Sequence, residues 1–165
     1  MSDLTILYPD VLSTDDNAVE RELLPDVDFE VHGGRAVSDV DDAVWAGADA
    51  MVTGIGMPID EQVFEKASNL KVICRLGVGY DLIDVAAAGR RGVRVCNVPD
   101  YGTAEVADHA MAMLLAFTRG VARYSEAFRD DPEDGWDYRL SPLQVRMRDK
   151  TMGIIGLGRI GTACA

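Results

Sequence analysis

The 165-residue chain is predicted to have an α/β fold built on a parallel sheet. Two features of the sequence support this prediction. Between residues 4 and 98, apolar runs of strand length alternate with short segments that have helix-capping residues. Further along, an apolar run at residues 150–155 leads directly into the sequence Gly-Leu-Gly-Arg-Ile-Gly at residues 156–161. The first feature predicts one complete sheet, and the second predicts the beginning of another.

The predicted strands are short apolar runs bounded by turn-forming residues such as Pro9, Gly33 and Gly34. They cover residues 4–8, 28–32, 48–53, 71–76 and 93–98. Strands that alternate with short helices form a parallel sheet that is covered on both faces. Residues 1–98 are therefore expected to form a flavodoxin-like unit, in which ligands bind beyond the carboxyl ends of the strands.

The first two helices are predicted from their capping residues. The polar residues 13–16 are expected to cap a helix that runs to about Leu24. Ser38 followed by Asp41 fits the N-cap and the acidic third position of a helix at residues 39–46. Both helices lie between predicted strands, as the alternation requires.

The next two helices are predicted in the same way. Pro58 marks the approach to a helix at residues 60–67, because proline is favoured at helix starts. Asp81 and Asp84 fit the N-cap and the third position of a helix at residues 82–88. These two aspartates are therefore predicted to be structural rather than catalytic.

Residues 99–148 are predicted to connect the two sheets. Pro99 marks the exit from the last strand, since proline disfavours helical backbone in the residue before it. A long, apolar-rich helix is predicted at residues 103–123, with Gly102 or Thr103 near its cap. The polar and proline-containing residues 129–142 are predicted to form a loop.

The glycine-rich sequence at residues 156–161 has the G-x-G-x-x-G spacing of dinucleotide-binding turns. In such a turn, Gly156 allows the tight bend, Gly158 lets the backbone approach a pyrophosphate, and Gly161 permits close packing of the following helix. A turn that serves packing alone is the alternative. A complete dinucleotide fold needs two βαβαβ halves and an acidic residue about 20 positions after the motif, and neither is present in these 165 residues. The chain is thus expected to be the front portion of a longer protein that continues into a Rossmann domain.

Composition excludes several classes of protein. The formal net charge of −12 disfavours a nucleic-acid partner, since phosphates would be repelled. No charged segment precedes an apolar segment at the N-terminus, and the apolar run at residues 110–118 is too short to cross a bilayer. Cys74, Cys96 and Cys164 lack C-x-x-C spacing and are predicted to be buried, reduced thiols with no metal. A cytoplasmic protein is expected.

The charged residues are biased in type. Aspartate outnumbers glutamate 20 to 8, and arginine outnumbers lysine 13 to 3. An acidic surface adapted to a high-salt cytoplasm and a GC-rich genome both explain this bias. Both explanations stay open from the sequence alone.

A second glycine turn follows the predicted strand at residues 71–76. Gly77 and Gly79 are separated by one residue, which lets backbone N–H groups turn toward a small anion. Arg75 lies at the end of the same strand. A tight turn without a ligand and an anion site are both compatible with this pattern.

Four segments, in their order and spacing, resemble the D-isomer-specific 2-hydroxyacid dehydrogenases, a family that includes phosphoglycerate dehydrogenases and the C-terminal-binding proteins. The segments are residues 70–84, 92–99, 106–110 and 153–161. The third departs from the usual Val-Ala-Glu-His of the family, because Asp108 stands in place of the glutamate. The carboxylate of aspartate is carried on a side chain one methylene shorter than that of glutamate.

The resemblance implies roles for residues on both glycine turns. The backbone N–H groups of Val78 and Gly79 would hold the substrate carboxylate, and Arg75 resembles a substrate-side arginine of the corepressor branch of the family. The cofactor, NAD or NADP, would contact Val106, Gly156, Leu157, Gly158, Arg159, Ile160 and Gly161. The catalytic arginine, glutamate and histidine of the family are expected beyond residue 165, so His109 is not the catalyst. No metal is implied.

The resemblance also implies an organisation and a function. Residues 1–98 would form the substrate domain, residues 99–148 a hinge with a long interface helix and loop, and residues 149–165 the start of a truncated NAD(P)-binding domain. The parent protein would transfer a hydride between NAD(P) and a small D-2-hydroxy or 2-keto acid, as a homodimer. An NAD-sensing, corepressor-like binding protein is the alternative. A free-standing binding module that ends near residue 125 would leave the second glycine motif without a role.

Overall fold

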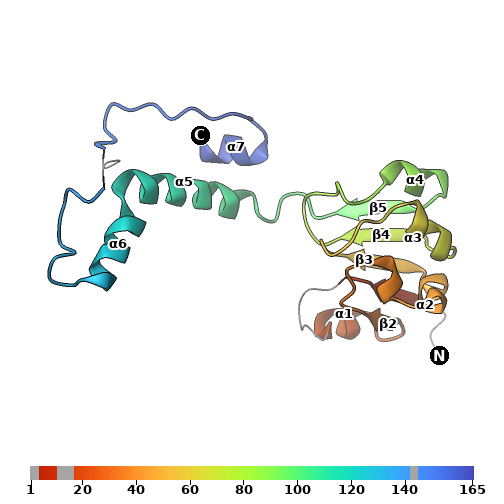
Figure 1. The fold of residues 1–165 in the computed structure, drawn as a ribbon. Helices are drawn as coiled ribbons and strands as arrows, with labels where there is room; N and C mark the ends of the chain where they lie inside the picture. Colours follow the sequence, from red (N-terminus) through yellow and green to blue (C-terminus); the bar gives the residue numbers. More distant parts are fainter. Residues whose placement is uncertain (1–3, 11–16, 142–144) are drawn as a thin grey trace. The chain divides into compact units, whose positions relative to one another are not determined.

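The computed structural model describes residues 4–10, 17–141 and 145–165. The chain divides into two compact units, Met1–Pro99 and Asp100–Ala165. We call them the sheet unit and the helical unit (Figure 1). Each unit is described separately.

The sheet unit is built on a five-stranded parallel sheet with the strand order β2-β1-β3-β4-β5. The strands are β1 (Thr5–Tyr8), β2 (Asp28–Val31), β3 (Ala50–Thr53), β4 (Val72–Arg75) and β5 (Arg94–Asn97). This order is the flavodoxin-like one. The predicted α/β class and parallel sheet are therefore confirmed.

Helices cover both faces of the sheet. They are α1 (Ala18–Leu23), the 3-10 helix η1 (Val37–Asp39), α2 (Asp42–Gly47), α3 (Glu61–Lys66) and α4 (Val85–Arg90). Leu7 points into the core formed with α2, α3 and α4, whereas Tyr8 points to the other face and contacts Phe29. There the guanidinium of Arg21 in α1 lies 5.0 Å from the centre of the Phe29 ring.

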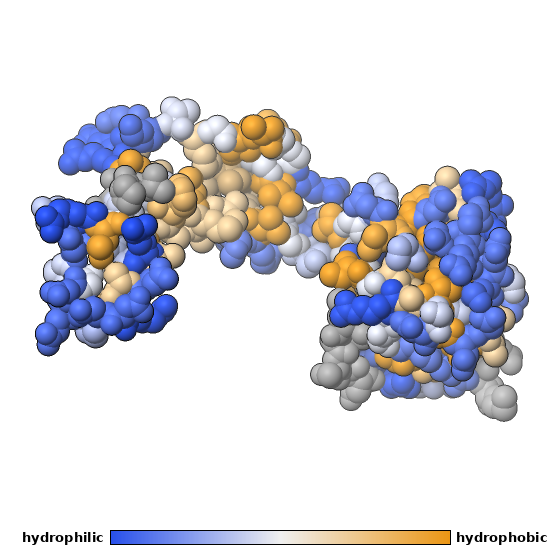
Figure 2. All heavy atoms as spheres, viewed as in Figure 1, coloured by the Kyte–Doolittle hydropathy of each residue, from blue (hydrophilic) through white to orange (hydrophobic). Residues whose placement is uncertain are grey.

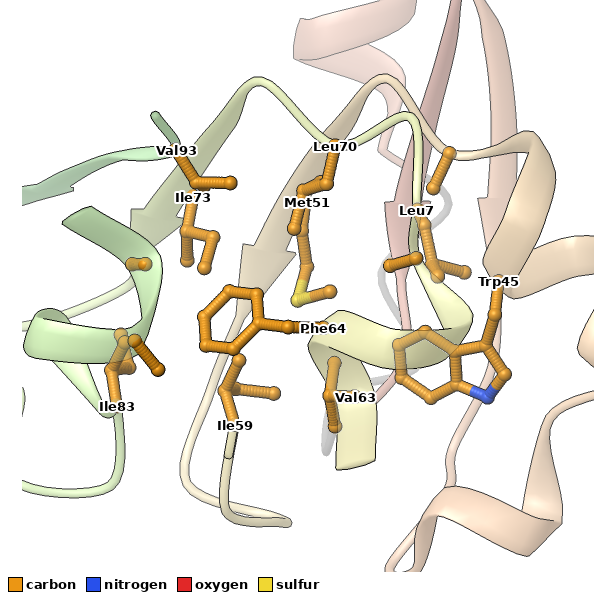
Figure 3. Packing of buried hydrophobic residues seen from close by; sticks show 14 of the residues in the cluster. Leu7, Trp45, Met51, Ile59, Val63, Phe64, Leu70, Ile73, Ile83 and Val93 are labelled. Atoms are coloured by element: carbon orange, nitrogen blue, oxygen red, sulfur yellow. The ribbon is translucent and has the colours of Figure 1, made fainter. Parts of the chain in front are cut away.

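The core lies between the sheet and helices α2, α3 and α4 (Figure 3). Met51 and Ile73 project from the central strands, and Trp45, Val63 and Phe64 project from the helices toward them. Fully burying one such side chain contributes roughly 1.5–3 kcal/mol. The buried apolar row therefore fixes the register of the strands and the positions of their carboxyl ends.

Helix α4 begins later than predicted. Asp84, not Asp81, is its N-cap, and its carboxylate accepts a hydrogen bond from the N–H of Ala87 at 2.8 Å. The residues before it form a turn at 81–82 and a parallel bridge between Ile83 and Ile59, in which the N–H of Ile59 donates to the carbonyl of Leu82 and the N–H of Asp84 donates to the carbonyl of Ile59. This bridge prevents the predicted helix at residues 82–88 from starting at Leu82.

The helix predicted at residues 39–46 is also shifted. Asp39 belongs to η1, where its carboxylate accepts hydrogen bonds from the N–H groups of Arg35 and Ala36. These bonds lower the pKa of Asp39. Val40 is extended and buried, so α2 begins only at Asp42.

Helices α3 and α1 lie where the sequence places them, with bounds of their own. Asp60 is the N-cap of α3, and Pro58 precedes it. Helix α1 ends at Leu23, whereas the predicted capping residues 13–16 lie outside the described residues.

The helical unit contains α5 (Thr103–Arg119), α6 (Val121–Asp130) and α7 (Arg159–Cys164). The prediction of a single helix at residues 103–123 is wrong, because Gly120 has a left-handed backbone with φ of 67° and ends α5. A Cβ atom at this position would lie 2.4 Å from the hydroxyl of Ser141. Helix α6 then extends to Asp130, so the start of the loop predicted at residues 129–142 is helical.

The strand predicted at residues 150–155 is not formed. A strand exists only when a neighbour accepts and donates its backbone hydrogen bonds, and no strand of the described residues pairs with this segment. The glycine turn does lead into a helix, α7, which lies beside α5 (Figure 1). None of the helices in the described part of the chain has the length and apolar character needed to span a bilayer.

Candidate functional site

Three polar side chains lie in one row at the carboxyl edge of the sheet. Thr53, Arg75 and Asn97 are register partners at the ends of β3, β4 and β5. In a parallel ladder, register partners point to the same face. Ligands of open α/β sheets bind beyond this edge, so the row and the loop that follows β4 are the candidate site.

Gly77 shapes the loop that follows β4. Its φ of +147° lies in a region that favours glycine, and its N–H donates to the carbonyl of Arg75 at 2.9 Å. A Cβ atom on Gly77 would lie 3.0 Å from Nη1 of Arg75. The chain therefore folds closely over the guanidinium.

Arg75 is held against this loop and is only 9% exposed. Its Nη1 donates to the carbonyl of Leu76, while no carboxylate of the described residues lies within ion-pair distance of it. A guanidinium has five N–H donors, and a nearly buried charge without a counter-charge is costly. The site is thus suited to a ligand that brings a negative charge.

The backbone next to Arg75 offers two further donors. The N–H groups of Val78 and Gly79 make no hydrogen bond to any acceptor in the described part of the chain. The loop is fixed by other contacts: Nδ2 of Asn97 donates to the carbonyl of Val78 at 2.8 Å, and the N–H of Val98 donates to the carbonyl of Gly77 at 3.1 Å. Successive unpaired N–H groups can hold the oxygens of a carboxylate through charge-assisted hydrogen bonds.

Asp10 is a residue of this edge that the sequence analysis missed. Its side chain is fully buried and accepts hydrogen bonds from the hydroxyl of Thr53 at 3.1 Å and from the N–H groups of Gly54 and Gly56, both at 2.8 Å. It thereby fixes the loop after β3, beside Arg75. Its position two residues after the first strand could have predicted this place, since polar residues that follow parallel strands meet at the carboxyl edge of the sheet.

The second glycine turn lies in the helical unit. Gly156 has a φ of +97°, and a Cβ atom on Gly161 would lie 2.0 Å from the carbonyl oxygen of Gly156. The first turn of α7 thus packs directly on the preceding bend, which only a glycine permits. By contrast, a Cβ atom on Gly158, the N-cap of α7, would meet nothing within 4 Å, so a ligand has room to approach.

The remaining predicted cofactor residues are also in the helical unit. Val106 is in the first turn of α5 and is 49% exposed, whereas Ala107 beside it is buried. Leu157 and Ile160 expose their side chains, and Arg159 begins α7. Asp108 and His109 lie on the exposed side of α5.

The prediction of buried thiols is wrong for Cys96, which is exposed at the end of the edge strand β5. Cys74 and Cys164 are half-buried, and all three cysteines are free. Burial, together with the neighbouring Cys96, raises the pKa of the Cys74 thiol. Across the described residues, no group of three or more potential metal ligands occurs.

The sequence and the fold both match known proteins. Residues 11–154 match the D-isomer specific 2-hydroxyacid dehydrogenase family over its catalytic domain. The chain is 42% identical to the glyoxylate reductase of Pyrococcus furiosus over 120 residues, which cover 71% of this chain and 36% of that protein. It is 41% identical to the D-3-phosphoglycerate dehydrogenase of Archaeoglobus fulgidus over 113 residues, covering 68% of this chain and 21% of that protein.

Solved structures give the same result. An NADPH-dependent glyoxylate/hydroxypyruvate reductase from Sinorhizobium meliloti, in complex with NADP and malonate, matches with a TM-score of 0.80 and 29% identity, over 99% of this chain and 49% of that one. The D-lactate dehydrogenase of Aquifex aeolicus, complexed with NAD and lactic acid, matches with a TM-score of 0.82 and 26% identity, over 96% of this chain and 46% of that one. The chain spans about half of these structures and about a third or less of the two curated relatives. It belongs to the D-isomer specific 2-hydroxyacid dehydrogenase family.

Proposed function

We propose that the protein to which this chain belongs is an NAD(P)-dependent dehydrogenase of small D-2-hydroxy acids. One observation carries the proposal: the nearly buried guanidinium of Arg75 lies beside the N–H groups of Val78 and Gly79, which no acceptor of the described residues pairs, at the carboxyl edge of the sheet. This combination is suited to a carboxylate, the group that all 2-hydroxy and 2-keto acids share. Family membership supplies the reaction type.

In this proposal, the sheet unit holds the substrate. Val78 and Gly79 donate their N–H groups to the carboxylate, and Arg75 supplies the positive charge. Asn97 and Asp10 do not touch the substrate. They fix the two loops next to the substrate. Asn97 donates a hydrogen bond to the carbonyl of Val78, and the carboxylate of Asp10 accepts hydrogen bonds from the N–H groups of Gly54 and Gly56.

The helical unit would hold the cofactor. Gly156, Gly158 and Gly161 form the turn onto which the pyrophosphate would fit, together with the backbone of residues 157, 159 and 160. The side chain of Val106 would pack against the nicotinamide. When bound, the nicotinamide supplies or accepts the hydride at C2 of the substrate.

The proton that accompanies the hydride requires a general acid/base. The resemblance assigns this role to a histidine oriented by a glutamate, with an arginine on the keto acid, all outside residues 1–165. We therefore expect the 165-residue chain, expressed alone, to show no measurable turnover of substrate.

We further propose a cytoplasmic homodimer. The free state of all three cysteines supports a reducing compartment. Helix α5 exposes Met113, Leu115 and Phe117, and Figure 2 shows apolar side chains gathered over this helix. A helix that is apolar on more than one side supports burial against a second copy.

Steady-state kinetics of the full-length protein test the proposal, with glyoxylate, hydroxypyruvate and pyruvate against NADH and NADPH. Arg75→Met should raise KM for the keto acid by about tenfold or more, since a hydrogen bond to a charged group contributes about 1.5–3 kcal/mol. The matched control is Arg94→Met, because Arg94 is exposed at the opposite end of β5. Absence of turnover with every acid and cofactor would reject a dehydrogenase.

A further inference from the structure

Two cysteines face each other on the strands that lead to the carboxylate loop. Cys74 of β4 and Cys96 of β5 are register partners. Their side chains therefore point to the same face of the sheet, and this is the face opposite to Ile73 and the core. Arg75 and Asn97, the next residue on each strand, point the other way. The thiols thus lie directly behind the proposed substrate site.

The spacing of the strands brings these thiols within bridging range. Neighbouring strands lie about 4.7–4.9 Å apart, and the Cα atoms of a disulfide are usually about 4.4–6.8 Å apart. The two groups also interact in the reduced protein, because Cys96 contributes to the raised pKa of Cys74. Cys96 is exposed and Cys74 is half-buried, so one thiol is open to a reagent and the other lies next to it.

We propose that Cys74 and Cys96 form a modification site, a dithiol that low-molecular-weight disulfides convert reversibly to an intramolecular disulfide that weakens substrate binding. The effect on substrate rests on the proposed function. The formation of the bridge does not.

The chemistry is two successive thiol–disulfide exchanges. The exposed thiolate of Cys96 attacks one sulfur of a small disulfide, forms a mixed disulfide and releases one small thiolate. The thiolate of Cys74 then attacks the sulfur of Cys96 and releases the second small thiolate. The two protons lost by the cysteines are taken up by the two released thiolates. In balance, two protein thiols are oxidised and one small disulfide is reduced.

The bridge would act on the substrate loop through two hydrogen bonds. The Cβ atoms of a disulfide lie about 3.8 Å apart, whereas those of register partners project side by side at about the strand spacing of 4.7–4.9 Å, so the bridge must tilt the two Cβ atoms toward each other and twist the ends of β4 and β5. Asn97 directly follows Cys96, and its side-chain amide donates a hydrogen bond to the carbonyl of Val78. The N–H of Val98 donates a hydrogen bond to the carbonyl of Gly77. A shift of β5 therefore moves the loop whose N–H groups would receive the carboxylate.

The same distortion makes the bridge reversible. Disulfides that are strained or exposed have higher reduction potentials than structural ones, and they are the regulatory ones. Cys96 is at an exposed edge strand, which leaves the bridge open to attack by a small thiol. Cys164 is the matched control, since it lies at the end of α7 in the helical unit.

The first measurement is a cross-link in the full-length protein. After equilibration with oxidised glutathione, blocking of free thiols and digestion with trypsin, the expected product is a disulfide-linked pair of peptides, residues 72–75 and 95–119. The pair should disappear on treatment with dithiothreitol and in both Cys74→Ser and Cys96→Ser. Glutathione retained on Cys96 without the cross-link would overturn the proposal.

The second measurement is the kinetic consequence. Oxidation should raise KM for the keto acid by about fivefold or more, with a smaller change in kcat, because the bridge perturbs substrate binding. Cys164→Ser should respond like the parent protein, whereas Cys96→Ser should not respond. A complete cross-link with unchanged KM would reject the link to substrate binding. If no keto acid is reduced, the proposed function fails, and the cross-link together with calorimetric titration of glyoxylate into both redox forms decides the inference.

Discussion

The side-chain amide of Asn97 donates a 2.8 Å hydrogen bond to the carbonyl oxygen of Val78, and this bond joins the end of β5 to the loop that follows β4. The carbonyl and the N–H of the next residue belong to the same peptide unit, so fixing the carbonyl of Val78 also orients the N–H of Gly79. Asn97 therefore acts as a positioning residue for one of the two proposed carboxylate donors.

Asn97→Ala should raise KM for the keto acid while leaving the affinity for NADH unchanged. The loss of one hydrogen bond costs about 0.5–1.5 kcal/mol, which corresponds to a change in KM of about twofold to tenfold. Asn69→Ala is the matched control, since Nδ2 of Asn69 donates a comparable 2.7 Å bond to the carbonyl of Ala46 elsewhere in the sheet unit. Equal kinetic effects of the two variants would show that Asn97 has no special relation to the site.

The two glycine turns should separate substrate binding from cofactor binding. Gly79→Val should impair substrate binding more than cofactor binding, and Gly158→Val should do the reverse. The backbone accepts a Cβ atom at both positions, because one on Gly79 meets only Asp81 at 3.4 Å and one on Gly158 meets nothing within 4 Å. Both effects therefore report on the approach of a ligand to the backbone.

The readouts are KM for glyoxylate and the dissociation constant of NADH, with Gly89→Ala in α4 as the control. Losses of the same size in both constants for both variants would mean that the turns serve folding alone. Gly77 is unsuitable for this test, since its positive φ and its contact with Arg75 make any side chain disruptive.

The fold was predictable where the signal is local. Runs such as residues 71–76 carry their strand tendency in apolar side chains, and the bend at Gly156 needs a positive φ that glycine supplies. Local patterns failed where distant residues decide the outcome. Ile59 pairs with the segment before α4 and moves the cap from Asp81 to Asp84, and Ser141 packs against Gly120 at the end of α5.

Some residues of the candidate site could likewise be predicted from local sequence, and others could not. Arg75, Val78 and Gly79 are consecutive or nearly so, and their pattern was visible in the sequence. Asp10 and Asn97 act across 43 and 19 residues of chain, on Thr53 and Val78 respectively. Single-sequence patterns do not contain such pairings, because only the strand order β1-β3-β4-β5 brings the partners together.

Helix α5 should carry the dimer interface. Phe117→Glu should dissociate the full-length protein into monomers at micromolar concentration, because the side chain is 64% exposed within its own unit and would place a charge in the apolar contact. Val19→Glu is the matched control, as Val19 of α1 is 66% exposed. Sedimentation velocity decides: a monomeric parent protein, or dissociation by both changes, would contradict this assignment.

Asp49 should contribute stability that is lost in acid. The hydrogen bond from Lys71 at 2.8 Å, followed by the bond from the N–H of Thr5 at 3.0 Å, lowers the pKa of the Asp49 carboxyl. Because the pKa is lowered in the folded state, the stabilisation is fully present at a pH above the pKa of the carboxyl in the unfolded chain, which is about 3.9. The stabilisation is lost as the pH falls through the lower pKa of the carboxyl in the folded state.

Asp49→Asn should therefore destabilise the chain at pH 7, and its difference from the parent should shrink below about pH 4. Urea unfolding of both forms across this range measures the difference. Asp28→Asn serves as the control, because Asp28 is an exposed carboxylate on the edge strand β2. A difference that stays constant with pH would show that the Lys71 contact does not depend on the ionised carboxyl.

The excess of aspartate should make stability depend on salt if it reflects a high-salt cytoplasm. With a net charge of −12, repulsion among carboxylates extends over a Debye length of about 30 Å at 0.01 M salt and only about 3 Å at 1 M. Stability should then rise with KCl. A GC-rich genome predicts a weaker dependence, because exposed ion pairs contribute only about 0–1 kcal/mol each. Melting temperatures between about 0.05 and 3 M KCl separate the two explanations: a steep rise supports adaptation to salt, whereas a flat or falling curve leaves genome composition as the cause of the bias.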